Sequence, residues 1–191
     1  MVIIKNTKTQ NDIIKKFNNN GESFFIQNYN FKYICDITPN NNDDKIIEYV
    51  EIYKRYKKYN SKSFNIDKDL HAYGNLTFCK FKINSAKIDS NPSGVYALVC
   101  KDKIIYIGET KKIKTRFNNG YGTISPRNCY KGGQRTNCRI NNRIYEMSIY
   151  HQKIKLYFYE CANYKEVEKL LLNSSNKNIQ INTEENIKNN N

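Results

Sequence analysis

The fold is decided by the stretch Gly94-Val95-Tyr96-Ala97-Leu98-Val99-Cys100-Lys101-Asp102-Lys103-Ile104-Ile105-Tyr106-Ile107-Gly108. Two short apolar runs flank a charged triplet, which is the pattern of a β-hairpin. Each run carries one tyrosine near a glycine. A turn with an odd number of residues, such as Cys100 to Asp102, would place Tyr96 directly opposite Tyr106 on one face of the antiparallel pair. We therefore expect two phenol hydroxyls to converge on one point.

The segment after this hairpin predicts a helix of about two turns, with a cap at Thr110 and a stop at Gly120. Ile113 and Phe117 are four residues apart and would face the sheet. Arg116 neighbours this buried face, so its side chain can lean over the sheet edge toward the two tyrosines. A solvated arginine on a basic helix is the plainer alternative.

The C-terminal part predicts a strand followed by a helix. Residues Lys153 to Glu160 alternate between apolar and polar types, which indicates a half-buried third strand. Asn163 and Glu166 form a capping-box pair at the start of the helix. Glu168 lies inside a broad apolar arc of that helix, and a carboxylate in such a place needs a partner. The arc comprises Tyr164, Val167, Leu170, Leu171 and Leu172.

These motifs resemble those of the GIY-YIG nuclease family. Gly94-Val95-Tyr96 is similar to the first triplet of the family, and Tyr106-Ile107-Gly108 is similar to the second. Arg116 matches an arginine that the family carries on the helix after the second triplet. Glu168 matches the metal-binding glutamate on the helix after the third strand, and Asn182 matches an asparagine some dozen residues later. The proline that usually precedes this asparagine is missing here.

The resemblance covers about residues 92 to 182 and implies an α+β fold. The expected core is a three-stranded antiparallel sheet flanked by helices, with an N-terminal α/β extension before it. Tyr96 would activate or orient a water molecule, and Tyr106 would hydrogen-bond the water or the phosphate. Arg116 would stabilise the transition state, and Glu168 would hold one divalent metal per active site. Mg2+ (or Mn2+) is expected, because it suits one carboxylate together with phosphate and waters.

Two points about this chemistry remain open at the level of the sequence. A phenol with a pKa near 10 is only about 0.1 per cent ionised at pH 7, so a tyrosine base needs nearby cations or a proton relay. Lys111 and Lys114 are equally placed to assist Arg116 in this. Glu168 also has an alternative role, as the partner of a buried Lys or Arg.

The chain is strongly basic, with a formal net charge of +14 and a pI of about 9.4. This charge favours a polyanionic partner. The stretch from Lys111 to Arg143 contains no Asp or Glu, whereas a merely solvated surface mixes signs. We therefore expect a phosphate-binding face there. The residues expected to contact DNA are Lys111, Lys114, Arg127, Lys131, Gln134, Arg135, Asn137 and Arg139.

The glycine-rich stretch from residue 121 to residue 142 suits a mobile loop that grips a nucleic-acid backbone. Its Gly-Gly-Gln and Thr-Asn-Cys segments resemble a stretch in the restriction-endonuclease branch of the family. An insertion with no role in specificity is the alternative. Thr136 is expected to cap a helix that runs to about Tyr150, with its apolar side chains inward. These are Ile140, Ile144 and Met147.

Residues 1 to 90 lie outside the resemblance, and we expect them to serve sequence recognition or dimerisation. A short helix is expected within residues 7–19, followed by strands over 23–27 and 31–37. A helix with a basic C-terminal end is expected from Asp43 onward, and a strand within residues 71–84. The predicted domains are thus residues 1–90, a nuclease core over 91–183 and a disordered tail over 184–191.

The cysteines and histidines do not form a metal site by their spacing. The six cysteines show no CxxC pair and no signal peptide precedes them, so we expect reduced thiols in a cytoplasmic protein. Cys129 and Cys138 lack the close spacing of zinc modules. His71 and His151 are expected to be packing or capping residues. No apolar run is long enough to cross a bilayer.

The expected function is a metal-dependent endonuclease that cleaves double-stranded DNA, most simply a type II restriction enzyme. Such an enzyme would act as a homodimer, since a symmetric double-strand cut is easiest with two active sites, and its genetic partner would be a cognate DNA methyltransferase. A mobile-element or repair nuclease is the alternative within the same chemistry. A nucleic-acid-binding protein that never cuts is the alternative from another class.

Overall fold

A computed structural model of the chain describes residues 14–17, 21–37, 78–83, 86–124, 128 and 133–175. The chain divides into two compact units. The first unit comprises Met1–Ile34, Pro92–Lys111 and Lys155–Asn191, and the second comprises Cys35–Asn91 and Lys112–Ile154. Both units are therefore assembled from distant parts of the sequence. The domain boundaries expected at residues 90 and 183 stay predictions.

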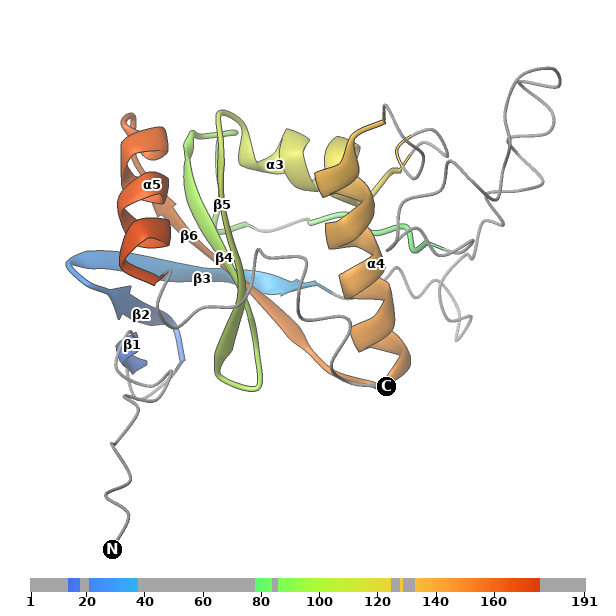
Figure 1. The fold of residues 1–191 in the computed structure, drawn as a ribbon, viewed down its shortest axis with the longest axis horizontal. Helices are drawn as coiled ribbons and strands as arrows, with labels where there is room; N and C mark the ends of the chain where they lie inside the picture. The colour runs from blue at the N-terminus through green and yellow to red at the C-terminus, as the bar shows by residue number, and fades with distance from the viewer. Residues whose placement is uncertain are drawn as a thin grey trace, which may run out of the picture. The chain divides into compact units, whose positions relative to one another are not determined.

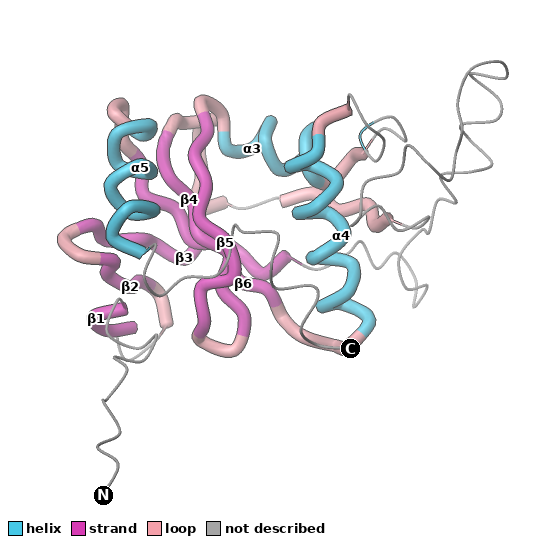
Figure 2. Tube along the Cα trace, in the orientation of Figure 1, coloured by secondary structure: helices cyan, strands magenta, loops and turns pink. Residues whose placement is uncertain are grey.

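Within the described residues, six strands form one sheet in the order β1-β2-β3-β6-β4-β5 (Figure 1). The strands are β1 (Ile14–Phe17), β2 (Ser23–Ile26), β3 (Tyr29–Ile37), β4 (Gly94–Cys100), β5 (Lys103–Thr110) and β6 (Ile154–Glu160). Antiparallel pairs join β1 to β2, β2 to β3, and β4 to β5. Helices and strands together confirm the α+β class (Figure 2). The predicted three-stranded sheet is an undercount, because the N-terminal strands join the same sheet beside β6.

The N-terminal hairpin of β2 and β3 turns over two residues, Gln27 and Asn28, because Ile26 pairs directly with Tyr29. Gln27 adopts a positive φ of 55° in this turn. The helix expected within residues 7–19 is wrong over Ile14–Phe17, which forms β1. Pairing with β2 outweighs the helical spacing of a few apolar residues there, since local propensity is a weak preference.

Several sequence predictions fall outside the described residues. These are the helix expected after Asp43, the tail over 184–191, and the residues His71, Arg127, Cys129, Lys131 and Asn182. Of the strand expected within residues 71–84, residues 78–83 are described, and they belong to no strand of the sheet. No helix among the described ranges combines the length and apolar character needed to cross a membrane.

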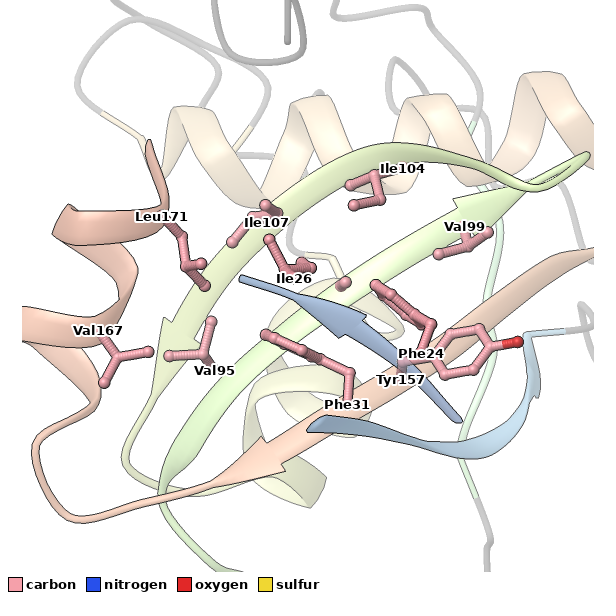
Figure 3. Packing of buried hydrophobic residues seen from close by; sticks show 11 residues of the cluster. Phe24, Ile26, Phe31, Val95, Val99, Ile104, Ile107, Tyr157, Val167 and Leu171 are labelled. Atoms are coloured by element: carbon pink, nitrogen blue, oxygen red, sulfur yellow. The ribbon is translucent and has the colours of Figure 1, made fainter. Parts of the chain in front are cut away.

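The core of the first unit lies between the sheet and helix α5 (Tyr164–Ser175), as Figure 3 shows. Val167 and Leu171 of α5 pack with Val95 and Val99 of β4 and with Ile107 of β5. All five are buried. Each such side chain stabilises the fold by about 1.5 to 3 kcal/mol on leaving water. This core fixes α5 on one face of the β4–β5 hairpin.

Aromatic side chains attach the N-terminal strands to β6. Phe24 stacks on Phe31, with ring centroids 5.5 Å apart, and meets the Tyr157 ring edge-on at 4.7 Å. The Tyr157 hydroxyl donates a hydrogen bond to the carbonyl of Gly21 at 2.9 Å. β6 was expected to be half-buried, but Tyr157 on its expected outer face is fully buried. The reason is that β6 is a central strand, flanked by β3 and β4.

The second unit contains α3 (Ile113–Thr115), the π-helical turn η2 (Arg116–Tyr121) and α4 (Arg135–Ile149). Ile113 and Phe117 are fully buried, as their spacing predicts. The expected stop at Gly120 is wrong by one residue, because the turn continues to Tyr121 with π geometry. The inward apolar side chains expected on α4 are confirmed. They are Ile140, Ile144 and Met147.

Candidate active site and basic helix

The β4–β5 hairpin turns over two residues rather than three. Lys101 and Asp102 have φ values of 48° and 58°, and Cys100 pairs with Lys103. Two consecutive positive φ values are the geometry of the type I′ turn that suits the twist of a hairpin. The expectation of a turn with an odd number of residues is therefore wrong.

A bulge at Ile105 determines the face of the sheet on which Tyr106 lies. Val99 pairs with Ile104, but Leu98 pairs with Tyr106, so Ile105 is an additional residue in β5. Without it Tyr106 would pair with Ala97 and point to the opposite face from Tyr96, because side chains alternate along a strand. The bulge brings both tyrosines to one face.

The two tyrosines are diagonal neighbours and do not face each other directly. Tyr96 pairs with Gly108, two residues beyond Tyr106. Their rings are nearly parallel, at 26°, with centroids 6.0 Å apart. Diagonal pairs on a sheet are within reach for aromatic side chains. The expected convergence thus takes the form of a stack of two phenol rings along the hairpin.

Gly108 is enclosed by this pair. A Cβ atom at Gly108 would lie 2.7 Å from Tyr96 Cζ and 2.7 Å from Tyr106 Cε1, and still closer to the Tyr96 hydroxyl oxygen. Real Cβ atoms do not approach other atoms so closely. The glycine of the second triplet is therefore required by the packing of the two rings.

Both tyrosines are buried in this structure. Tyr96 is 1% exposed and Tyr106 is 9% exposed. All seven residues of β4 are buried, so both faces of this strand are covered. A substrate could reach these hydroxyls only after the tyrosine face is uncovered.

Glu168 lies in the same unit, on α5. It is half-buried and lies on the helix surface between Leu171 and Leu172, whereas Glu166 in the first turn is exposed. The expected apolar arc is therefore present but narrower, because Leu170 is 54% exposed. Among the described residues, no three His, Cys, Asp or Glu side chains group as a metal site. A single carboxylate with substrate phosphate and waters is still a donor set that Mg2+ accepts.

Arg116 belongs to the second unit, at the start of η2. Its backbone N–H donates to the carbonyl of Lys112, and its guanidinium carbon lies 5.7 Å from the centroid of the Tyr121 ring. Tyr121 in turn meets Phe117 edge-on at 5.3 Å. The arginine is thus placed on a buried aromatic ring of its own turn. The sequence predicts a loop from Tyr121 onward, and the structure instead places its ring under Arg116 at the end of η2.

The N-terminus of α3 is capped from a distant position in the sequence. Asn91 accepts hydrogen bonds from the backbone N–H of Lys114 at 2.7 Å and of Thr115 at 3.4 Å. Its side-chain amide also donates to the Thr115 hydroxyl at 2.8 Å. Thr110, the expected cap, is instead the last residue of β5. Lys111 is exposed and Lys114 half-buried.

Helix α4 carries arginines on one outward stripe. Arg135 and Arg143 are exposed and Arg139 is half-buried, at successive spacings of four residues. Arg143 forms an ion pair with Glu146 at 3.3 Å. The helix begins at Arg135, so Thr136 is not its cap as expected. Since α4 starts there, residues 135–142 are helical rather than part of a mobile loop.

Two other residues expected to contact DNA lie at the start of α4. Gln134 is exposed, and its side-chain oxygen accepts a hydrogen bond from the Asn137 amide. Asn137 is buried. The structure therefore places Asn137 where it holds the helix start.

Asn141 and Asn142 of α4 are buried, although the sequence motifs predict no role for them. The Asn141 amide donates to the carbonyls of Cys79 and Tyr121, at 2.7 and 2.6 Å, and its oxygen accepts from the Cys79 N–H at 3.1 Å. Asn142 is also buried, and its Nδ2 has no hydrogen-bond partner among the residues that the structure describes. The helical spacing does indicate a role for Asn141, because it shares a helix face with Ile144 and Cys138. A polar side chain on such an apolar face needs hydrogen-bond partners.

The five described cysteines are free thiols. Burial raises the pKa of Cys79 to about 12, and burial together with Asp36 raises that of Cys35 to about 11. Such thiols remain protonated and unreactive near neutral pH. Cys138 is buried in α4, and His151 is exposed in the turn after that helix.

No family model, no curated protein and no solved structure matches this chain.

Proposed function

We propose that this protein is a metal-dependent endonuclease that hydrolyses phosphodiester bonds in double-stranded DNA, with chemistry similar to that of the GIY-YIG family. The observation that supports it best is the stack of Tyr96 on Tyr106, formed around Gly108 by the bulge in β5. Two aromatic rings can be buried in a core without a bulge. The bulge at Ile105 is needed only to bring the Tyr106 phenol to the same face as Tyr96. The arginine stripe of α4 supplies charge suited to a phosphate backbone.

The proposed roles follow the chemistry that hydrolysis needs. Tyr96 orients or deprotonates the attacking water, and Tyr106 hydrogen-bonds the water or the phosphate. Arg116 offsets the charge that grows on the non-bridging oxygens. Glu168 would hold the metal, which supplies further positive charge at the phosphate or leaving oxygen. A type II restriction role, a homodimer, a cognate DNA methyltransferase and a cytoplasmic location belong to the same proposal.

A second candidate is a nucleic-acid-binding protein that does not cut. The burial of Tyr96 and Tyr106 favours it, because buried phenols can serve the core alone. The two candidates differ in whether the tyrosine face opens to DNA. They share the expectation that DNA binding weakens with salt, by a log–log slope of roughly −0.9 for each phosphate contacted.

The decisive experiment measures plasmid cleavage and DNA affinity in parallel, with Mg2+ or Mn2+. Tyr96→Phe and Arg116→Ala should each lower turnover by about 100-fold or more and leave DNA affinity largely intact, because both act on the transition state. Tyr159→Phe is the matched control. It alters a half-buried tyrosine of β6, and the variant should cleave DNA at the normal rate. Wild-type turnover in either variant would overturn the mechanism. DNA binding without any cleavage by the unaltered protein would establish the second candidate.

The metal assignment has its own test. Glu168→Ala should abolish cleavage and the rise in melting temperature that Mg2+ causes, because ligand binding to the folded state stabilises it. Glu166→Ala, at an exposed position of the first turn, should lose about 1 kcal/mol of stability at most and no activity. If Glu168 is instead the partner of a buried cation, its removal should cost about 3 to 5 kcal/mol with or without metal.

A further inference from the structure

Residues 78–83, here called the strap, are an extended segment of the second unit whose backbone is held at every second residue. Cys79 is bracketed by the Asn141 side chain, through both its N–H and its carbonyl. The N–H of Phe81 donates to the carbonyl of Gly122 at 3.2 Å. Ile83 is bracketed by Asn118, which accepts from its N–H at 2.7 Å and donates to its carbonyl at 3.2 Å.

These bonds replace a neighbouring strand. A primary amide presents one acceptor and donors side by side, as a peptide group at a strand edge does. Cys79, Phe81 and Ile83 are accordingly buried, while Lys82 between two of them is exposed. The alternating pattern that predicted a strand is therefore real, although two asparagine side chains and one carbonyl take the place of the strand's partner.

Two partners of the strap, Asn118 and Gly122, belong to η2 or follow it directly, and the third, Asn141 of α4, is hydrogen-bonded to η2. Asn118 lies within η2, and Asn141 also donates to the carbonyl of Tyr121, its last residue. Gly122 follows at once, and a Cβ atom there would lie 2.9 Å from the carbonyl oxygen of Phe117 and closer still to that of Phe81. The strap thus presses against the end of the turn so closely that only glycine fits.

The π geometry of this turn is what puts Arg116 on the Tyr121 ring. These residues are five apart, and in an α-helix residues five apart point about 140° away from each other. In η2 the N–H of Gly122 instead donates to the carbonyl of Phe117 at 2.6 Å, an i to i+5 bond, which brings residues five apart to one side. Such π turns are rare, and this one is in contact with the strap.

We propose that Asn118 is a positioning residue for Arg116, which it keeps in its orientation on Tyr121 by tying η2 to the strap. This inference rests on the proposed function, in which Arg116 acts on the transition state. Loss of the Asn118 pair would let the turn relax toward α geometry and rotate Arg116 relative to Tyr121. A displacement of about 1 Å at a catalytic group can lower a rate about 100-fold.

The test compares Asn118→Asp with Asn119→Asp. An ionised aspartate at residue 118 can accept from the Ile83 N–H but cannot donate to its carbonyl, whereas a protonated carboxyl group restores both bonds. Asn119 lies in the same turn and is exposed, so its replacement adds the same charge without breaking the strap. The readouts are the single-turnover cleavage rate at saturating DNA, the Kd for DNA and the circular dichroism spectrum, from about pH 5 to pH 8.

Partial burial and the facing Ile83 carbonyl should raise the pKa of the new carboxyl group above its ordinary range. The Asn118→Asp rate should therefore be about tenfold below that of the unaltered protein at pH 8 and should approach it as the pH falls, with unchanged DNA affinity and folding. The Asn119→Asp rate should follow the unaltered protein at every pH. A merely structural role would lower the folded fraction or the affinity and would overturn the inference, as would a normal rate for Asn118→Asp at pH 8. Absence of cleavage by the unaltered protein would instead refute the proposed function.

Discussion

The tyrosine hairpin and the arginine turn are built by different kinds of interaction. The hairpin takes its shape from strand pairing, a bulge and apolar packing, so each tyrosine is fixed by the register of the backbone. The arginine turn takes its shape from side-chain amides that reach across the sequence, from Asn118 and Asn141 to residues 78–83. Apolar packing tolerates small changes of side-chain volume. By contrast, a backbone segment that is hydrogen-bonded by one side-chain amide keeps unsatisfied N–H and carbonyl groups when that amide is replaced.

The largest effect should come from Asn141→Leu, which removes the shared partner of Cys79 and Tyr121. Three buried backbone groups would lose their hydrogen bonds, and the expected loss is about 3 to 5 kcal/mol of unfolding free energy. Urea denaturation measures it. The neighbouring Asn142→Leu is the control, and because the Asn142 Nδ2 makes no hydrogen bond with the described part of the chain, the change should be neutral or stabilising. Equal losses of unfolding free energy from both changes would mean that the hydrogen bonds of Asn141 do not stabilise the arginine turn.

A smaller effect is expected from Gly108→Ala in the hairpin. The added methyl group would overlap the Tyr96 and Tyr106 rings, and the strain should cost about 2 to 3 kcal/mol as the rings shift. Gly120→Ala is the control, because a Cβ there meets its nearest atom at 3.7 Å. That change should stabilise by up to about 1 kcal/mol, since alanine favours a helical turn. Thermal melts of the two variants measure both effects. An unchanged melting temperature for Gly108→Ala would contradict the described ring packing.

The hairpin, the helices and most of the buried positions could be predicted from the sequence because each rests on local periodicity. The apolar run of β4, the spacing of Ile113 with Phe117 and the inward face of α4 are of this kind. The bulge at Ile105 could not be predicted, since one additional residue in an apolar run leaves no mark on its composition. The Asn91 cap and the strap were equally hidden, because they join residues more than twenty positions apart.

The smallest effect concerns the pH dependence of stability through Cys79. Its thiol has a pKa of about 12 in the folded chain against an ordinary value of 9.0. Below pH 9 the thiol is protonated in both states, so the shift has no effect there. As the pH rises from 9 to 12 the unfolded thiol ionises first, and stability falls, by about 1 kcal/mol near pH 10.

The Cys79→Ala variant should lose less stability than the unaltered chain between pH 7 and pH 10, as urea denaturation at each pH would show. Cys161→Ala is the control, because its thiol is only half-buried and should contribute less to the slope. Identical slopes in all three proteins would mean that the strap opens to solvent at alkaline pH before the chain unfolds.

The bulge at Ile105 and the π turn of η2 have a shared consequence for how this chain can change in evolution. Each contains one additional residue that sets the direction of one side chain. This side chain is Tyr106 in the strand and Arg116 in the helix. Substitutions at the surface of either element leave that direction intact. A deletion of a single codon between residues 101 and 121 does not, because it reverses the face of a strand or rotates a helix. Homologous sequences should therefore vary in composition here while keeping the same length from Tyr96 to Tyr121.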